Sequence, residues 1–182
     1  ADMPEIEIRP AVAEEIPNLI HLEHDYTSDY VWQMELQPPE EDRIGINFRQ
    51  VRLPRSVKVD YPRPVSTLAE DWMRRSGILV AIHAGEIVGY LSLMLDIAPL
   101  TTWVTDLAVA PAMRRKGIGS ALVLAGMAWG AQHESYRLVL EMQPKNYPAI
   151  CLAKKLGFEF CGYNDRYYPN HDIALFFAKV LR

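Results

Sequence analysis

The chain has 182 residues, of which 49% are hydrophobic and 23% are charged, and its formal net charge is −4. This length and composition are typical of one globular domain with a full core, here residues 1–182, and exclude a disordered chain or a broad nucleic-acid-binding face. The two cysteines, Cys151 and Cys161, match neither a disulfide framework nor a zinc-ligand spacing, so we expect a cytoplasmic protein with no metal site.

Two elements are predicted near the N-terminus. Residues 5–9 alternate polar and apolar side chains, which predicts a half-buried strand. Residues 12–26 are predicted to form a helix, with Pro17 tolerated only near its first turn. No basic segment followed by an apolar run begins the chain, so no signal peptide is expected.

Residues 27–64 have the least regular pattern in the chain. They include five prolines, an acidic run at residues 40–42 and scattered aromatic residues. Within them, only residues 43–52 alternate well enough to predict a strand. A short helix is predicted over residues 68–75, and Gly77 ends it.

The rest of the chain predicts strands that alternate with helices. The predicted strands are 78–82, 87–95, 103–109, 136–141, 158–163 and 173–180, and the predicted helices are 117–132 and 147–156. A turn around Gly85 requires an antiparallel pair, whereas strands joined by a helix require parallel pairs, so the sheet is expected to be mixed. The uncharged run 117–132 is too short to span a bilayer, so no membrane interaction is expected.

A basic, glycine-containing loop lies between a strand and a helix. Its sequence is Arg114-Arg115-Lys116-Gly117-Ile118-Gly119-Ser120. Unpaired N–H groups at a helix start, together with the helix dipole, favour phosphate, and glycines let a phosphate reach them. The alternative is that the glycines simply end a loop whose cations are solvated.

A dinucleotide-binding unit is a second interpretation of this loop. Gly117 and Gly119 are followed by Glu141 at about the distance expected for a ribose-binding acid. However, Leu122 stands where the third glycine would be, and residues 110–116 separate the strand from the first glycine. Both departures disfavour this interpretation.

The loop resembles the Arg/Gln-x-x-Gly-x-Gly/Ala motif of the GNAT superfamily of acetyl-CoA-dependent N-acetyltransferases, and the preceding residues 107–111 are similar to that family's strand. A second similar motif follows, formed by Asn146, Ala149, Ile150, Leu152, Lys155, Gly157 and Phe158. The resemblance extends from residue 78 to the C-terminus. Residues 140–143, 146, 149–151 and 168–177 also look similar to streptothricin acetyltransferases.

The resemblance implies an α/β fold with a central mixed sheet, splayed between strands 103–109 and 136–141 and flanked by helices. Residues 78–182 would form the acetyl-CoA-binding core, and residues 1–77 the acceptor-side elements. The coenzyme-binding residues that it implies are Leu107, Ala108, Val109, Arg114, Arg115, Lys116, Gly117, Ile118, Gly119, Ser120, Asn146, Ala149 and Lys155.

Acetyl transfer to an amine requires a group that accepts the amine proton and one that protonates the departing thiolate. Family members often use a tyrosine as the acid, but Ala153 occupies that position here. Tyr147 and Tyr168 are our main candidates for the acid, and Tyr163, Tyr167 and water are further ones.

Asp106 and Glu141 are the candidate bases, although structural ion pairing would explain them equally well, and a water relay would need neither. The nearby thiol of Cys151 is interpreted as packing.

Acidic residues between Glu23 and Asp42 lie among Tyr26, Tyr30 and Trp32. Carboxylates beside aromatic faces suit an ammonium group, although an ordinary solvated surface has the same composition. We therefore expect direct transfer from acetyl-CoA to a primary amine of a small cationic acceptor, such as an antibiotic or a polyamine. A protein N-terminal or lysine acetyltransferase and a non-catalytic acyl-CoA sensor are the alternatives. The final strand is a candidate homodimer contact.

Overall fold

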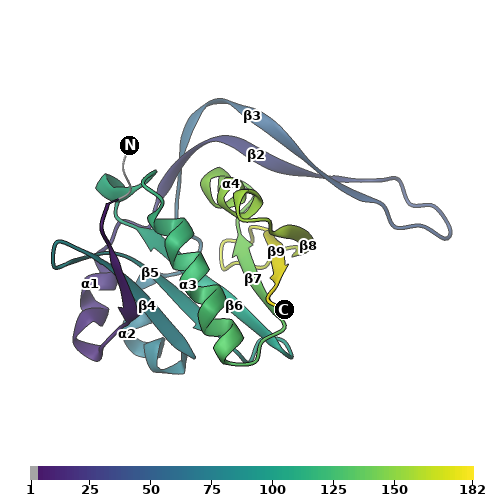
Figure 1. The fold of residues 1–182 in the computed structure, drawn as a ribbon. Helices are drawn as coiled ribbons and strands as arrows, with labels where there is room; N and C mark the ends of the chain where they lie inside the picture. The colour runs from purple at the N-terminus through teal and green to yellow at the C-terminus, as the bar shows by residue number, and fades with distance from the viewer. Residues whose placement is uncertain (1–3) are drawn as a thin grey trace.

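A seven-stranded mixed sheet forms the centre of the protein in the computed structural model, which describes residues 4–182 (Figure 1). Residues 1–3 of the expected domain lie outside the described residues. In spatial order the strands are β1 (Glu7–Pro10), β4 (Gly77–His83), β5 (Glu86–Met94), β6 (Thr101–Val109), β7 (Arg137–Met142), β9 (Ala174–Val180) and β8 (Glu159–Asn164). β6 and β7 run parallel and every other pair is antiparallel, so the predicted mixed α/β class is confirmed.

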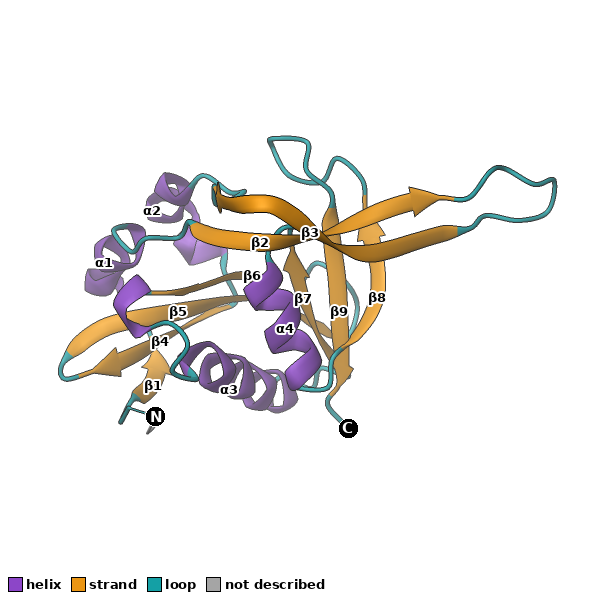
Figure 2. Cartoon of the chain, turned by 90° about the horizontal axis from the view of Figure 1, so that it is seen from above, coloured by secondary structure: helices purple, strands orange, loops and turns teal. Residues whose placement is uncertain are grey.

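Helices cover both faces of this sheet (Figure 2). They are α1 (Ile16–Ile20), α2 (Leu68–Asp71), α3 (Ile118–Gln132) and α4 (Tyr147–Lys155), with 3₁₀ turns at Ala13–Glu15, Val65–Thr67, Trp72–Arg74 and Pro111–Met113. The larger core cluster joins α3 and α4 to one face of the sheet, and a smaller one joins α1 and α2 to the other. None of the helices in residues 4–182 is long and apolar enough to cross a bilayer.

The helix predicted over residues 12–26 is wrong in its second half. Helical structure ends at Ile20, and Tyr26 begins a strand. The buried ring of His24 explains the change, because its Nδ1 lies 2.7 Å from the Leu22 carbonyl oxygen and its Nε2 lies 2.8 Å from the Tyr90 hydroxyl. These tertiary contacts hold the chain in a non-helical path that local propensity does not encode.

The irregular stretch after it forms a long hairpin of β2 (Tyr26–Leu36) and β3 (Ile46–Val59). The predicted strand 43–52 corresponds to β3, but β3 begins three residues later, at Ile46, and continues to Val59. The sequence did not predict β2. Both strands belong to a two-stranded sheet that lies mostly outside the core, so neither carries a clean alternation. Pro54 fits inside β3 because each strand of such a ribbon has one unpaired edge.

The hairpin crosses over α4 and β8, and its distal end projects away from the body of the protein (Figures 1 and 2). The Trp32 backbone N–H donates to the Pro144 carbonyl at 2.9 Å, and the Lys154 ammonium lies 4.2 Å from the centroid of the Trp32 ring. Further along, Phe48 packs against Phe160. These contacts fix the hairpin and thereby the segment that follows it, residues 60–64.

The sheet opens between β6 and β7. Residues 101–104 of β6 pair with residues 137–140 of β7. Beyond Val104, β6 pairs with β5 alone. Thr105 is the extra residue of a β-bulge at the same place, because Asp106 pairs with Ser92 while Val104 pairs with Leu93. The predicted splay of the sheet is thus present, and the bulge turns Asp106 to the face that α1 and α2 cover.

Candidate active site

The loop before α3 presents its backbone N–H groups to solvent. Gly117 is the N-cap of α3 with φ of 84°, and Arg115 also has a positive φ of 63°. Within residues 4–182 no acceptor is found for the N–H groups of residues 115–120. A fifteen-residue helix adds its dipole behind these groups, so the loop can hold a phosphate or a pyrophosphate.

The three cations of the loop have different positions. Arg114 turns back into the protein, where its Nε donates to the Val109 carbonyl at 2.8 Å and its Nη2 donates to the Glu23 carbonyl at 2.7 Å. It therefore ties the loop to β6 and to the segment between α1 and β2. Arg115 and Lys116 are exposed beside the unpaired amides, where a phosphate would be attracted to them.

The gap between β6 and β7 continues from this loop. The Ala110 N–H donates to the Val88 carbonyl of β5, so Ala110 directs its peptide group toward β5. Because successive residues of a strand alternate in this respect, Ala108 also faces β5, whereas the peptide groups of Leu107 and Val109 face the gap. Across the gap, Asn146 Oδ1 accepts the Ala149 N–H at 3.1 Å and caps α4. Lys155, predicted to bind the coenzyme, is exposed at the far end of α4 and does not line the gap.

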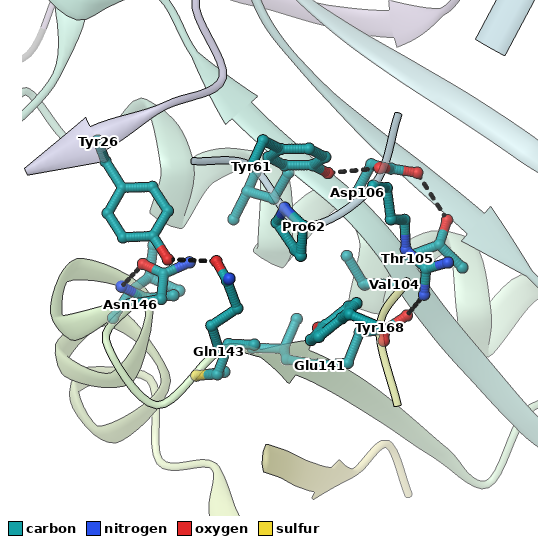
Figure 3. A pocket seen from close by; sticks show the side chains of 16 residues that line it. Tyr26, Tyr61, Pro62, Val104, Thr105, Asp106, Glu141, Gln143, Asn146 and Tyr168 are labelled. Carbon is teal, nitrogen blue, oxygen red and sulfur yellow. Dashed lines mark hydrogen bonds and ion pairs between the residues drawn. The ribbon is translucent and has the colours of Figure 1, made fainter. Parts of the chain in front are cut away.

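A pocket occupies the gap (Figure 3). Its lining residues come from six separate parts of the chain: Tyr26, Tyr61, Pro62, Arg63, Val104, Thr105, Asp106, Leu107, Leu140, Glu141, Met142, Gln143, Asn146, Ala149, Leu152 and Tyr168. Two carboxylates, three tyrosines and one arginine are thus brought together at the point where the sheet opens.

Glu141 is the most deeply buried carboxylate of this pocket, with a side chain only 1% exposed. Its Oε1 accepts from Arg63 Nη2 at 2.5 Å and from Trp103 Nε1 at 3.2 Å, whereas its Oε2 has no partner among the described residues. Burial raises the pKa of Glu141 above its ordinary value, although Arg63 and Trp103 act in the opposite direction. A carboxylate in this state is suited to accept a proton from a bound cation.

Asp106, the other predicted base, is fully engaged. It accepts a hydrogen bond from the Tyr61 hydroxyl and another from the Thr105 hydroxyl at 3.1 Å, and Arg75 lies 3.4 Å away. Burial and the Asp106 charge raise the pKa of Tyr61 well above its ordinary value, so the phenol stays protonated and keeps donating. This arrangement suits Asp106 to holding Tyr61 in place.

The predicted aromatic residues separate into two groups. Tyr26 and Tyr168 line the pocket, and the Tyr26 hydroxyl donates to Gln143 Oε1 at 2.7 Å. Tyr30 instead packs against Tyr147, with ring centroids 4.5 Å apart, and neither lines the pocket. Trp32 also lies outside it, under Lys154.

Tyr61 and Arg63 were missed as candidate site residues. They lie in the irregular stretch after β3, and the hairpin carries them to the gap. The Tyr-Pro-Arg-Pro sequence at 61–64 was the available signal, because two prolines make a short rigid segment around one cation. No spacing in the sequence relates that segment to Asp106 or Glu141.

Comparison with known proteins gives one matching family and several relatives. The model of the acetyltransferase (GNAT) family matches residues 46–158, so the match begins well before residue 78. Streptothricin acetyltransferase of Streptomyces lavendulae is 28% identical over 166 residues, which cover 88% of this chain and 83% of that protein. N-alpha-acetyltransferase of Sulfurisphaera tokodaii is 33% identical over 117 residues, covering 58% of this chain and 70% of that one.

Solved structures share the fold. Nourseothricin acetyltransferase superposes with a TM-score of 0.82 at 22% identity, over 97% of this chain and 99% of that one. A proposed streptothricin acetyltransferase of Bacillus anthracis, solved in complex with acetyl coenzyme A, gives 0.76 at 17% identity, again over 97% and 99%. The shared fold thus extends over nearly the whole chain, including the elements before residue 78.

Proposed function

The chain belongs to the acetyltransferase (GNAT) family, and from this premise we propose that it acetylates a primary amine of a small cationic acceptor of the streptothricin or polyamine kind. The acetyl donor is acetyl-CoA, as in the family. The observation that carries the proposal is the buried Glu141 carboxylate at the opening of the sheet, with tyrosines around it and one oxygen unpartnered. A site of this composition favours an ammonium group.

The coenzyme would lie along the gap between β6 and β7. Its pyrophosphate would bind the unpaired N–H groups of residues 115–120. Its pantetheine arm would bond the peptide group of Leu107 and the N–H of Val109, whose carbonyl already accepts from Arg114. Asn146 and Ala149 would form the opposite wall. This course brings the thioester toward Glu141 and Tyr168.

The reaction we propose is a direct transfer. Glu141 accepts a proton from the acceptor ammonium, and the neutral nitrogen attacks the thioester carbonyl carbon. The carbon–nitrogen bond forms, the carbon–sulfur bond breaks, and the thiolate takes a proton. Tyr168 is the candidate donor, because burial and the charge of Glu141 raise its pKa and keep the phenol protonated at neutral pH. The second amine proton is lost to solvent, and transfer of the proton held by Glu141 to the Tyr168 phenolate restores both residues.

Ala153 explains why the acid must come from elsewhere in the chain. Its side chain is completely buried within the core on α4, so this helix offers no hydroxyl at that position. Tyr168 reaches the same pocket from the loop between β8 and β9. The departure from the family pattern is therefore compatible with catalysis and does not require a sensor function.

The acceptor class rests on two further points. The streptothricin acetyltransferase match extends over 88% of this chain, whereas the N-alpha-acetyltransferase match extends over 58%. In addition, segment 60–64 lies across the acceptor side, where Tyr61 and Arg63 contact the two buried carboxylates. A small acceptor fits this arrangement better than an extended peptide.

The test is thiol release from acetyl-CoA with a panel of streptothricin, spermidine, an aminoglycoside and an alanine-initiated peptide. We expect turnover with small cationic amines and about a hundredfold or greater loss of kcat in Glu141→Gln, with acetyl-CoA affinity retained. Glu159→Gln, which changes an exposed glutamate on β8, is the matched control. If the peptide is acetylated and the small amines are not, the protein is an N-alpha-acetyltransferase and the proposed acceptor class is wrong. Coenzyme binding without turnover of any amine would favour a sensor.

A further inference from the structure

Arg63 occupies the place where an acceptor cation would be expected. Its Nη2 lies 2.5 Å from Glu141 Oε1, and its guanidinium carbon lies 5.8 Å and 5.6 Å from the ring centroids of Tyr167 and Tyr168. A carboxylate together with two aromatic rings is a typical environment for a bound ammonium or guanidinium ion. In this structure the protein's own arginine fills it.

The contact covers the carboxylate without using all of it. The Arg63 side chain is 29% exposed, whereas that of Glu141 is 1% exposed. Glu141 Oε2 is shielded from solvent and has no partner among the described residues. A structural ion pair would be expected to satisfy both oxygens, for example through a bidentate arginine. The Arg63 contact therefore leaves one oxygen of Glu141 as a buried acceptor without a hydrogen-bond partner among the described residues.

A second cavity lies on the other side of Arg63. Arg63 and Asp106 line both cavities, and the rest of the second is formed by residues 64–75 in and around α2, together with Tyr90 and Pro169. Asp71 lines it, and Asp71 Oδ1 has no partner among the described residues. Asp71 Oδ2 lies 3.6 Å from Arg75, which leaves Oδ1 free for a second cation.

We propose, on the basis of the proposed function, that Arg63 occupies the acceptor's cation site at Glu141 and that a cationic acceptor displaces it into the neighbouring cavity, where Asp71 receives it. The exchange replaces one ion pair at Glu141 by another and gives the displaced guanidinium a new carboxylate partner. No buried charge is left unpaired, which would otherwise make the exchange costly. A neutral acceptor cannot replace the arginine, so the exchange selects cationic acceptors.

The first experiment measures KM and kcat for spermidine and streptothricin in Arg63→Met. If Arg63 leaves Glu141 free about a tenth of the time, its removal lowers KM about tenfold, because the acceptor no longer competes with it. Arg63→Gln, which keeps a hydrogen bond without the charge, should act in the same direction. Arg63→Lys keeps a competing cation and should remain near the wild type. Arg55→Met, at an exposed arginine of β3, is the control and should change neither constant.

The second experiment tests the destination of the arginine. Asp71→Asn should raise KM about threefold in the wild-type background, since the displaced guanidinium loses its partner. In Arg63→Met the same change should have no effect, because no arginine is displaced. This non-additivity distinguishes the exchange from two independent structural roles.

The outcomes separate this inference from the proposed function. If the wild type acetylates cationic amines but Arg63→Met and Arg63→Gln leave KM unchanged or raise it, Arg63 is a structural anchor and the exchange is wrong. If the wild type acetylates no amine, the proposed function fails. Calorimetric binding of spermidine then decides the exchange, with tighter binding in Arg63→Met supporting it and equal or absent binding in both proteins contradicting it.

Discussion

The two sides of the gap are built in different ways. The proposed coenzyme side offers unpaired backbone N–H groups of six consecutive residues, 115–120, at the start of one helix. The proposed acceptor side offers side chains that come from distant segments, among them Tyr26, Tyr61, Arg63, Glu141 and Tyr168. Coenzyme binding should therefore depend on loop conformation, whereas acceptor recognition should change with single side chains and leave the coenzyme unaffected.

The largest expected effect tests the coenzyme side. Gly117→Asp places a negative charge beside the N–H groups that would hold the pyrophosphate, and we expect about a hundredfold loss of acetyl-CoA affinity by calorimetry. Asparagine tolerates the positive φ at this position about as well as aspartate and carries no charge, so Gly117→Asn is the matched control. Equal affinities of the two variants would contradict an electrostatic role for this loop.

A smaller effect is expected on the acceptor side. Tyr168→Phe removes the candidate proton donor from the pocket, and kcat should fall about tenfold to a hundredfold because water replaces a phenol poorly. Acetyl-CoA affinity should stay unchanged. Tyr147→Phe serves as the comparison, since Tyr147 packs against Tyr30 outside the pocket. A larger loss of kcat in Tyr147→Phe would reverse the assignment of the acid.

The pH dependence tests the environment of Glu141. Burial raises the pKa of Glu141, and a base works only when it is deprotonated. The loss of activity on acidification should therefore begin at a higher pH than it would with an ordinary glutamate. Because Arg63 lowers the pKa of Glu141, Arg63→Met should move the acidic limb of kcat/KM to higher pH.

The wild type and Arg63→Met are compared with the same amine, so that ionisation of the amine affects both profiles equally. The control Arg55→Met should not move the acidic limb of kcat/KM. A downward shift, or none, would show that Glu141 does not control the acidic limb.

The smallest effect concerns the anchor of the hairpin. Lys154→Met removes the ammonium above the Trp32 ring and should lower the free energy of unfolding by about 0.5 kcal/mol in urea denaturation. Lys155→Met, the neighbouring exposed lysine, should have less effect on stability. Loss of acetyl-CoA affinity in Lys154→Met would show that the two sides of the gap are coupled through the hairpin.

The same difference explains how much of the fold could be predicted. Strand 103–109 and helix 117–132 were predicted almost as observed, at Thr101–Val109 and Ile118–Gln132, because each is a nearly uninterrupted run of apolar or buried residues. The β2–β3 hairpin was not, because it lies mostly outside the core. The bulge at Thr105 also leaves no local signal, since it depends on pairing with β5.

The site follows the same rule. The loop at residues 114–120 and the helix start after it could be located from the sequence, since glycines and cations adjoin one another there; phosphate binding by this loop stays a prediction. The partners of Glu141 could not be located in this way, because Arg63 is 78 residues away and reaches it only through the hairpin. Arg114 shows the limit within the loop itself, since tertiary carbonyl acceptors draw its guanidinium inward.

We propose that coenzyme and cationic acceptor meet in the gap between β6 and β7, beside Glu141. The decisive measurement is a crystal structure with coenzyme A and an accepted amine. We expect the pyrophosphate on the N–H groups of residues 115–120, the amine nitrogen within hydrogen-bonding distance of Glu141, and Arg63 withdrawn toward Asp71. An amine bound away from Glu141, with the Arg63–Glu141 pair intact, would contradict it.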